Sequence, residues 1–380
     1  MLTSSTDWGP AVCSIGGVGC PANDCFCSDN HWGYSYWDGE GWQDYQVGAD
    51  SSPISDGAVE GWRWGPFGGS ELFPDLSPAQ PLLAATPALD WLHSQQSAVD
   101  GGYGSMGAVA ETLFAIGANN LSTADWKHQA DSPSLQSYVT SKGAAYSLSG
   151  VDAAGKLAVG LSATGNCWPL DALRPMDFYS PTTGVFMGTY GTGSEPQSWA
   201  ILGTLTLDQD VPENALEYLC DAQQSDSGWE WQADFGSDKN STSLATQALI
   251  SGGEPITSSV IVDALNFLKS AQNDNGGFTY DPKSAWGTDS DTNSTAYVVQ
   301  ALLAAGQDPT SSDWTVSDNN PISYLLSMQL PDGNFEYKPG QGPNRLATRQ
   351  AVPALLGRSF PLKVTELEAC YGLFMPVLYK

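Results

Sequence analysis

The feature that most constrains this chain is a short pattern that occurs four times: an aromatic residue, leucine, three further residues and glutamine. The copies are Trp91-Leu92-x3-Gln96, Tyr218-Leu219-x3-Gln223, Phe267-Leu268-x3-Gln272 and Tyr324-Leu325-x3-Gln329. Four or five residues after each glutamine comes a glycine, followed by an aromatic residue. The glutamines of the last three copies are 49 and 57 residues apart, which is the length of a helical hairpin. Because one hairpin cannot bury its apolar face alone, we expect the copies to stack on one another.

Each of these turns leads into a segment rich in small residues that we expect to be a helix. Such helices are predicted at 107–117, 197–205, 241–249, 294–302 and 347–356, with further ones at 134–146 and 153–163. Two segments are nearly identical, Ser241-Thr242-x4-Gln247-Ala248-Leu249 and Ser294-Thr295-x4-Gln300-Ala301-Leu302. Ser241 and Ser294 are predicted N-caps, since a serine hydroxyl accepts the unpaired N–H groups of a first turn. Eleven or twelve helices are expected in all, enough to close a ring.

The N-terminal region differs in composition from the rest of the chain. Four of the seven cysteines are Cys13, Cys20, Cys25 and Cys27, in a stretch without helical periodicity. Their spacing fits disulfides better than the paired CxxC arrangement of zinc sites. Cys25 and Cys27 are too close to bridge each other comfortably, so each is expected to pair with Cys13 or Cys20. The other three cysteines are an odd set, which leaves at least one thiol free or paired between chains.

Residues 30–65 alternate aromatic and polar positions, which predicts short β-strands. We therefore expect a small, truncated β domain at 1–65, a Pro-rich linker at 66–81, a helical domain at 82–360 and a tail at 361–380. One unpaired edge strand of the β domain would allow self-association.

The charge balance excludes some classes of partner. With 14 Lys and Arg against 42 Asp and Glu, the formal net charge is −28, so nucleic acid is not an expected partner. No apolar run is long enough to span a membrane. The cysteine-rich start indicates an oxidising compartment, yet the first residues lack the pattern of an export signal. We expect a bacterial extracellular or cell-surface protein whose export signal is missing from this sequence.

The repeat resembles that of squalene and oxidosqualene cyclases, in which Gln-x3-Gly-x-aromatic follows the aromatic-Leu pair. Gln272-x3-Gly276-x-Phe278 and Gln329-x3-Gly333-x-Phe335 match it without gaps. The resemblance covers about residues 82–360. It implies the α/α toroid shared by terpenoid cyclases, protein prenyltransferase β-subunits, complement thioester domains and cobalamin carriers. The segment from Trp32 to Trp62 is also similar to part of the small β domain of cobalamin carriers, which makes a corrinoid a candidate ligand.

Class II cyclases of this family protonate an alkene with an aspartate in a D-x-D-D-T-A motif at the start of an inner helix. The matching stretch here is Asp291-Thr292-Asn293-Ser294-Thr295-Ala296, where an amide replaces the central acid. Because an amide has no proton acidic enough for this step, we expect a protein without catalytic residues. If it were a cyclase, Asp289 and Asp291 would be its acids. The sequence also lacks the zinc ligands of the prenyltransferases, so no metal site is expected.

Four aromatic residues in the long turns lie outside the repeat positions and are the predicted ligand contacts: Trp231, Tyr280, Trp286 and Tyr337. Large aromatic side chains provide much apolar contact area at little entropic cost. The sequence therefore favours a non-catalytic extracellular binding protein, holding a small apolar or corrinoid-like ligand or a surface partner. The alternatives are a class II terpenoid cyclase and a structural, self-assembling surface protein.

Overall fold

The computed structural model describes residues 2–6, 9–38, 41–47, 51–52, 59–66, 79–187, 193–284 and 287–370. The chain divides into two compact units, Met1–Leu83 and Ala84–Lys380. Among the described residues, no helix combines the length and apolar character needed to cross a bilayer.

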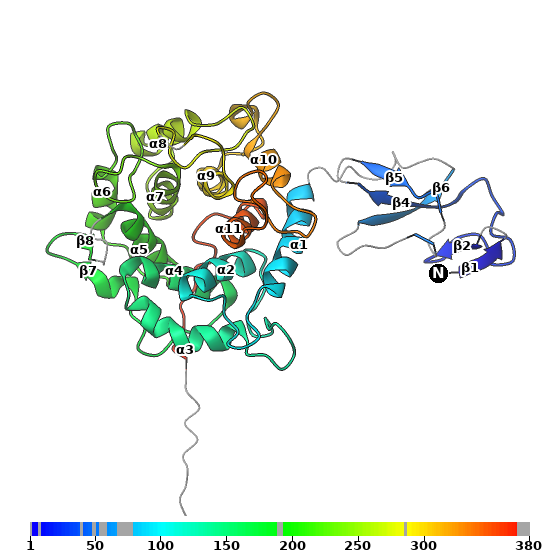
Figure 1. The fold of residues 1–380 in the computed structure, drawn as a ribbon, viewed down its shortest axis with the longest axis horizontal. Helices are drawn as coiled ribbons and strands as arrows, with labels where there is room; N and C mark the ends of the chain where they lie inside the picture. Colours follow the sequence, from blue (N-terminus) through cyan, green and yellow to red (C-terminus); the bar gives the residue numbers. More distant parts are fainter. Residues whose placement is uncertain are drawn as a thin grey trace, which may run out of the picture. The chain divides into compact units, whose positions relative to one another are not determined.

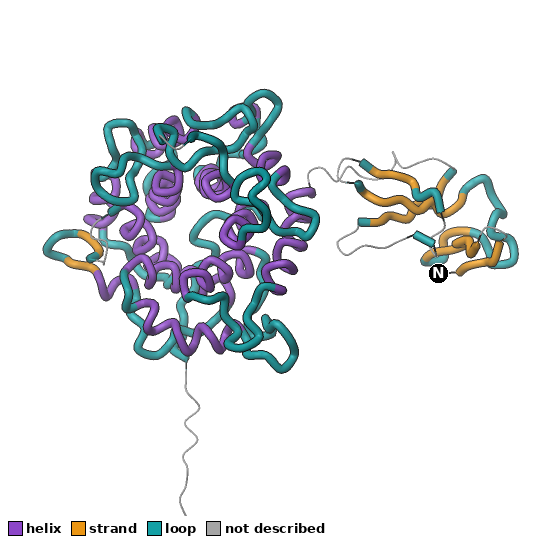
Figure 2. The backbone as a smooth tube through the Cα atoms, viewed as in Figure 1, coloured by secondary structure: helices purple, strands orange, loops and turns teal. Residues whose placement is uncertain are grey.

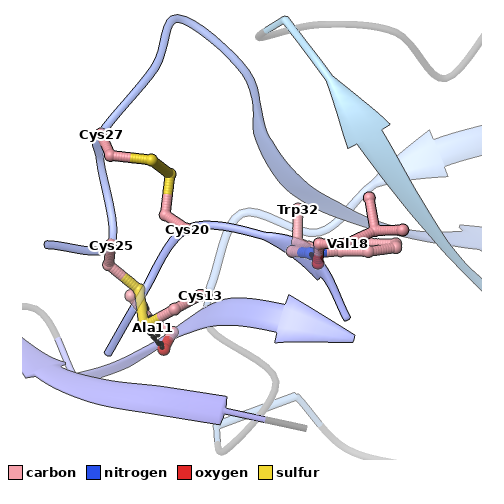
Figure 3. The surroundings of a disulfide bond; sticks show 7 residues. All are labelled: Ala11, Cys13, Val18, Cys20, Cys25, Cys27 and Trp32. Atoms are coloured by element: carbon pink, nitrogen blue, oxygen red, sulfur yellow. Dashed lines mark hydrogen bonds between the residues drawn. A yellow bond between two sulfur atoms is a disulfide. The ribbon is translucent and has the colours of Figure 1, made fainter. Parts of the chain in front are cut away.

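The first unit contains two small antiparallel sheets. One has the order β1 (Leu2–Thr6), β2 (Gly9–Ile15), β3 (Val18–Gly19), and the other β5 (Trp42–Asp44), β4 (His31–Trp37), β6 (Glu60–Gly65). Figure 3 shows the two disulfides beside the first sheet, Cys13–Cys25 and Cys20–Cys27. The indole Nε1 of Trp32 donates to the carbonyl oxygen of Val18 at 3.1 Å, which ties β4 to β3.

Aromatic stacking stabilises the second sheet of this unit. The ring of Tyr34 on β4 lies between those of Trp62 on β6 and Tyr45, each with a centroid distance of 4.4 Å. Such cross-strand aromatic pairs add to sheet stability beyond the area that they bury. A unit this small has little room for an apolar core, so the disulfides and this aromatic stack supply the contacts that hold it together.

Six helices of the second unit form a closed inner ring (Figure 1). In ring order they are α2 (Met106–Ala118), α4 (Val151–Thr164), α5 (Ser194–Thr206), α7 (Lys239–Ser251), α9 (Thr292–Ala304) and α11 (Arg345–Leu355). Each contacts the next, and α11 returns to α2. Their many small residues allow close approach: Gly155 of α4 packs directly against the backbone of Trp199 on α5. The inner helices are buried on nearly all sides.

The outer layer consists of α1 (Gln80–Ser94), α3 (Leu135–Ser147), α6 (Glu213–Asp221), α8 (Ser259–Lys269) and α10 (Pro321–Ser327), visible around the ring in Figure 2. Two 3₁₀ turns (Pro175–Phe178 and Ser312–Trp314) and the hairpin β7 (Tyr179–Ser180) and β8 (Val185–Phe186) complete it. The repeated glutamines join these elements. In all four copies the side-chain amide donates to a carbonyl of its own turn and to one of the next outer segment. The last copy, Gln329, bonds Ala84 at 2.8 Å and so links the end of the ring to α1.

The predicted fold class, a mainly helical α/α toroid after a disulfide-bearing β region, is confirmed, with eleven α-helices among the described residues. The predicted N-caps were wrong. Asp238 and Asp291 cap α7 and α9, and Ser241 and Ser294 donate their backbone N–H and hydroxyl groups to them. A carboxylate three residues upstream accepts both donors, so each helix starts two residues earlier than predicted.

Candidate functional site

Equivalent positions on the six inner helices form layers inside the ring. Because all six begin at the same end of the ring, their sixth residues lie at one depth, one and a half turns below the mouth. We call this set the central layer: Glu111, Lys156, Trp199, Leu244, Tyr297 and Gln350. A carboxylic acid, a lysine, two aromatic residues, an amide and a leucine thus lie at one depth in the ring.

Glu111 is the titratable centre of this layer. It is the one charged residue of α2 and is half-buried, and its Oε2 accepts a hydrogen bond from Nε2 of Gln350 on α11 at 3.3 Å. Burial raises the pKa of the Glu111 carboxyl above its ordinary value, against the opposing influence of Lys156, Gln350 and Arg349. The residue is thereby biased towards the neutral acid, while groups that stabilise its anion lie close by.

Lys156 supplies the positive charge of the site. Its Nζ lies 3.3 Å from Oε1 of Glu195 and 5.3 Å from the ring centroid of Trp199. Burial alone would lower the pKa of Lys156, but the carboxylates of Glu195 and Glu111 outweigh it and hold the pKa above its usual range. Lys156 therefore stays protonated, and its side chain connects the central layer to Glu195 one turn nearer the mouth.

Tyr297 interacts electrostatically with carboxylates on other helices of the ring. Tyr297 lies on α9, two positions around the ring from both α2 and α5, and Glu111 and Glu195 both act on its hydroxyl. Burial is the main reason that the pKa of Tyr297 lies well above its usual value, and these two carboxylates add to it.

Phe114, one turn further along α2 than Glu111, places a second aromatic ring beside Trp199 of the central layer. The rings of Trp199 and Phe114 stack with centroids 5.5 Å apart, and both residues are fully buried. The Nε1 of Trp199 has no hydrogen-bond partner among the described residues. The interior thus combines a carboxylic acid with π faces, an arrangement that can protonate an apolar substrate and then stabilise a cation.

The predicted acids are not in this centre. Asp289 is exposed to solvent. Asp291 is buried, and burial raises the pKa of its carboxyl, but both of its oxygens accept hydrogen bonds from Ser294. Asp291 therefore acts as a helix cap at the rim. Asn293, in the position of the family's acid, has an Oδ1 that no described residue bonds.

The predicted ligand contacts lie at the starts of different inner helices. The carbonyl of Tyr280 accepts from the N–H of Lys239 at the start of α7, and that of Tyr337 from Thr292 at the start of α9. The carbonyl of Trp231 lies against Gly193, which precedes α5. These three residues line the rim, with Tyr280 39% exposed. Trp286 lies outside the described residues, and ligand contact by the four stays a prediction.

Sequence reasoning missed Glu111 and Lys156. The D-x-D-D-T-A motif predicts an acid at the start of a helix, whereas Glu111 lies in the middle of one. The available signal was a lone carboxylate in Met106–Ala118, a segment otherwise composed of small, apolar and hydroxyl residues. A charge enclosed by such a segment must face either a partner or an interior site.

Comparison with known proteins bears on what this interior does. Residues 192–345 match the family model described as the squalene-hopene cyclase C-terminal domain. This stretch includes α5, α7 and α9 and three of the four glutamine repeats. No curated protein sequence matches the chain.

Solved structures of the type II terpene cyclase MstE from Scytonema are similar to this chain. The apo enzyme has a TM-score of 0.54 at 14% identity, covering 74% of this chain and 98% of that one. A variant bound to geranylgeranyl dihydroxybenzoate, its substrate, scores 0.52 at 13% identity, covering 73% and 97%. A variant bound to its product merosterolic acid A scores 0.50 at 14%, covering 73% and 97%. At these identities the likeness establishes the toroid fold.

These findings contradict the prediction of a non-catalytic binding protein and favour its alternative, a class II terpene cyclase. The physical reason for the error is that the prediction equated a missing motif aspartate with a missing acid, whereas Glu111 brings a carboxyl group into the ring from α2. The likeness to cobalamin carriers, and with it a corrinoid ligand, stays a prediction from the sequence.

Proposed function

We propose that the toroid is an enzyme of the class II terpene cyclase type, which cyclises an isoprenoid after Glu111 protonates one of its double bonds. The observation that carries this proposal is the half-buried Glu111 carboxyl, whose pKa burial raises and whose Oε2 is bonded by Gln350 at 3.3 Å. A donor to an alkene must be neutral at rest and leave a stabilised anion. Burial raises the pKa of Glu111 and so favours its neutral form, while Lys156, Gln350 and Arg349 favour the anion that remains after proton transfer.

In the first step the O–H bond of Glu111 breaks and its proton forms a C–H bond with the π electrons of the terminal alkene. The carboxylate that remains is stabilised by Gln350 and Lys156, while the substrate carries a tertiary cation. A neighbouring alkene attacks this cation and closes a ring, and the charge moves along the chain. Loss of a proton from the last cation to water, and reprotonation of Glu111 from water, complete the balance.

The aromatic residues of the interior suit the cationic stages. The faces of Trp199, Phe114 and Tyr297 present negative quadrupole potential, which attracts a carbocation as it attracts an ammonium group. Glu195 holds Lys156 in an ion pair at 3.3 Å, and this partner reduces the repulsion between Lys156 and the moving positive charge.

The test compares Glu111→Gln with the exposed control Glu217→Gln, each incubated with squalene and with geranylgeraniol. We expect cyclised products from the wild type and the control, and a loss of at least about a hundredfold in Glu111→Gln. Asp291→Asn should retain activity, since asparagine also caps helices. Cyclisation that survives Glu111→Gln, or is abolished by Asp291→Asn in a folded protein, would overturn the assignment of the acid.

The pH profile provides an independent check. Because the donor must be protonated and its pKa is raised, activity should persist above the ordinary titration range of a glutamate and fall as pH rises through the Glu111 pKa. Lys156→Met removes a positive charge that favours the Glu111 anion, so activity should be lost at a higher pH than in the wild type. At lower pH, where Glu111 is protonated in both proteins, the variant should react more slowly. A profile that does not respond to Lys156→Met contradicts the coupling.

We also propose that the protein works outside the cytoplasm. The support is its three disulfides, Cys13–Cys25, Cys20–Cys27 and Cys167–Cys370, which persist in oxidising compartments. Cell fractionation checks this location. The protein should be found outside the cytoplasm, with six of its cysteines in disulfides.

A further inference from the structure

The C-terminal segment 357–370, which we call the plug, runs across the ends of the inner helices opposite the mouth. The hydroxyl of Ser251 at the end of α7 donates to the carbonyl of Phe360, and that of Ser162 on α4 donates to Lys363. The N–H of Thr365 donates to the carbonyl of Thr206 at the end of α5. The disulfide Cys167–Cys370 then fixes the end of the plug beyond α4. The plug is thus attached to three inner helices at their C-terminal ends.

The glutamines of the two repeated Ser-Thr-x4-Gln-Ala-Leu segments bind the backbone of the plug. Gln247 and Gln300 are the ninth residues of α7 and α9, one turn below the central layer, and both are buried. Oε1 of Gln247 accepts the N–H of Phe360 at 2.9 Å, and Nε2 of Gln300 donates to the carbonyl of Arg358 at 3.3 Å. These buried amides therefore hold the backbone at Phe360 and just before it.

The side chain held in this way completes the aromatic cluster below Glu111. The Phe360 ring lies 5.1 Å from both Phe114 and Trp199, measured between centroids, and crosses each at a steep angle. Trp199 belongs to the central layer, so Phe360 packs directly against that layer. Phe360 is 4% exposed, and no other residue of the plug is part of this aromatic cluster among the described rings.

We propose that Phe360 is the floor of the substrate site and sets the length of isoprenoid that the ring admits. This inference rests on the proposed function, since it assigns the interior to an isoprenoid chain. A phenyl ring and one isoprene unit have similar volume, so removing the ring should admit a chain longer by about one unit. The residue acts by positioning the chain, with Gln247 and Gln300 keeping it in place.

Binding of chains that cannot cyclise tests the floor separately from the chemistry. The probes are the fully hydrogenated forms of geraniol, farnesol, geranylgeraniol and geranylfarnesol, with binding measured by calorimetry. Phe360→Ala should shift the best-bound chain one unit longer and tighten that chain by about tenfold, and Phe360→Trp should shift it one unit shorter. If Phe360→Ala does not fold, Phe360→Leu replaces it, with a smaller shift in the same direction.

Leu362→Ala is the matched control, because Leu362 belongs to the plug and packs on the core but is not in the aromatic cluster. It should leave the order of the chain lengths unchanged. The assignment of the floor is overturned if folded Phe360→Ala and Phe360→Trp proteins prefer the same chain length as the wild type. It is also overturned if Leu362→Ala changes the preferred chain length as much as Phe360→Ala does. Saturated chains need no proton donor, so a length shift without turnover of the unsaturated chains would reject the cyclase proposal and leave the floor standing.

Discussion

At the scale of single residues, Lys239, the first residue of α7, is a buried basic group outside the site. It is fully buried, and its Nζ donates to the carbonyl of Phe267 at 3.1 Å and lies 3.3 Å from that residue's ring centroid. Burial lowers the pKa of Lys239 to about 7, and the carboxylates of Asp226 and Asp238 offset this only in part. Folding therefore disfavours the charged form of this lysine.

This gives a pH-dependent prediction. Between pH values of about 7 and 10.5 the unfolded chain binds more protons at Lys239 than the folded one, so stability rises with pH across that window. Lys239→Met should remove this rise and raise the free energy of unfolding by ~1–3 kcal/mol near neutral pH. Urea unfolding at several pH values measures both effects, with exposed Lys142→Met as the control. A steeper dependence on pH in Lys239→Met would contradict the burial of this lysine as the cause.

The same scale shows where sequence reasoning reached its limit. The D-x-D-D-like stretch correctly located the start of α9, because a cap depends on local spacing. It could not point to Glu111, because the partners of this residue come from α4 and α11, distant in sequence. The depth of a side chain inside the ring depends on where its helix begins. Because the starts of α7 and α9 were predicted too late, the sequence could not show which residues lie at the same depth.

At the scale of elements, the glutamine repeat is a connection between hairpins. Each glutamine spans two backbone carbonyls, one in its own turn and one in the next outer segment, so a single side chain both closes a turn and fixes a neighbour. The pattern predicted stacked hairpins from sequence alone because this contact is repeated at constant spacing. The aromatic residues at the repeat positions, Trp229, Phe278 and Phe335, are fully buried under their turns.

Gln329→Ala tests the connection that closes the ring. It removes bonds to Gly333 and Ala84 at 2.9 and 2.8 Å, so we expect a loss of ~1–3 kcal/mol in the free energy of unfolding. Gln95→Ala, at a partly exposed glutamine just after α1, should change stability by less than ~1 kcal/mol. Chemical denaturation compares the two, and equal losses would mean that the repeat glutamine contributes no more than a surface side chain.

At the scale of the whole molecule, a disulfide between residues 203 positions apart joins the end of α4 to the end of the plug. In the chain-entropy description, cross-linking a loop this long stabilises the folded state by about 5 kcal/mol. The paired change Cys167→Ser with Cys370→Ser should therefore lower the melting temperature markedly. It should also expose the plug to protease before the ring itself unfolds.

Cys220 is the natural control for this change. Its thiol is free, and burial raises its pKa to about 11, so it stays protonated and unreactive at neutral pH. Cys220→Ser should leave the melting temperature nearly unchanged. If the paired serine variant melts at the wild-type temperature, the plug is held by its hydrogen bonds alone. Self-association through an edge strand of the β unit stays a prediction, which sedimentation at increasing concentration would check.

The most direct measurement of the central claim is a reaction in deuterium oxide. If a protein carboxylic acid in exchange with water starts the cyclisation, each cyclised molecule gains one deuterium at the carbon protonated first, and mass spectrometry with NMR locates it. We predict this label with the wild type and no labelled product with Glu111→Gln. Cyclised product without solvent deuterium at that carbon would contradict a proton-initiated reaction in this ring.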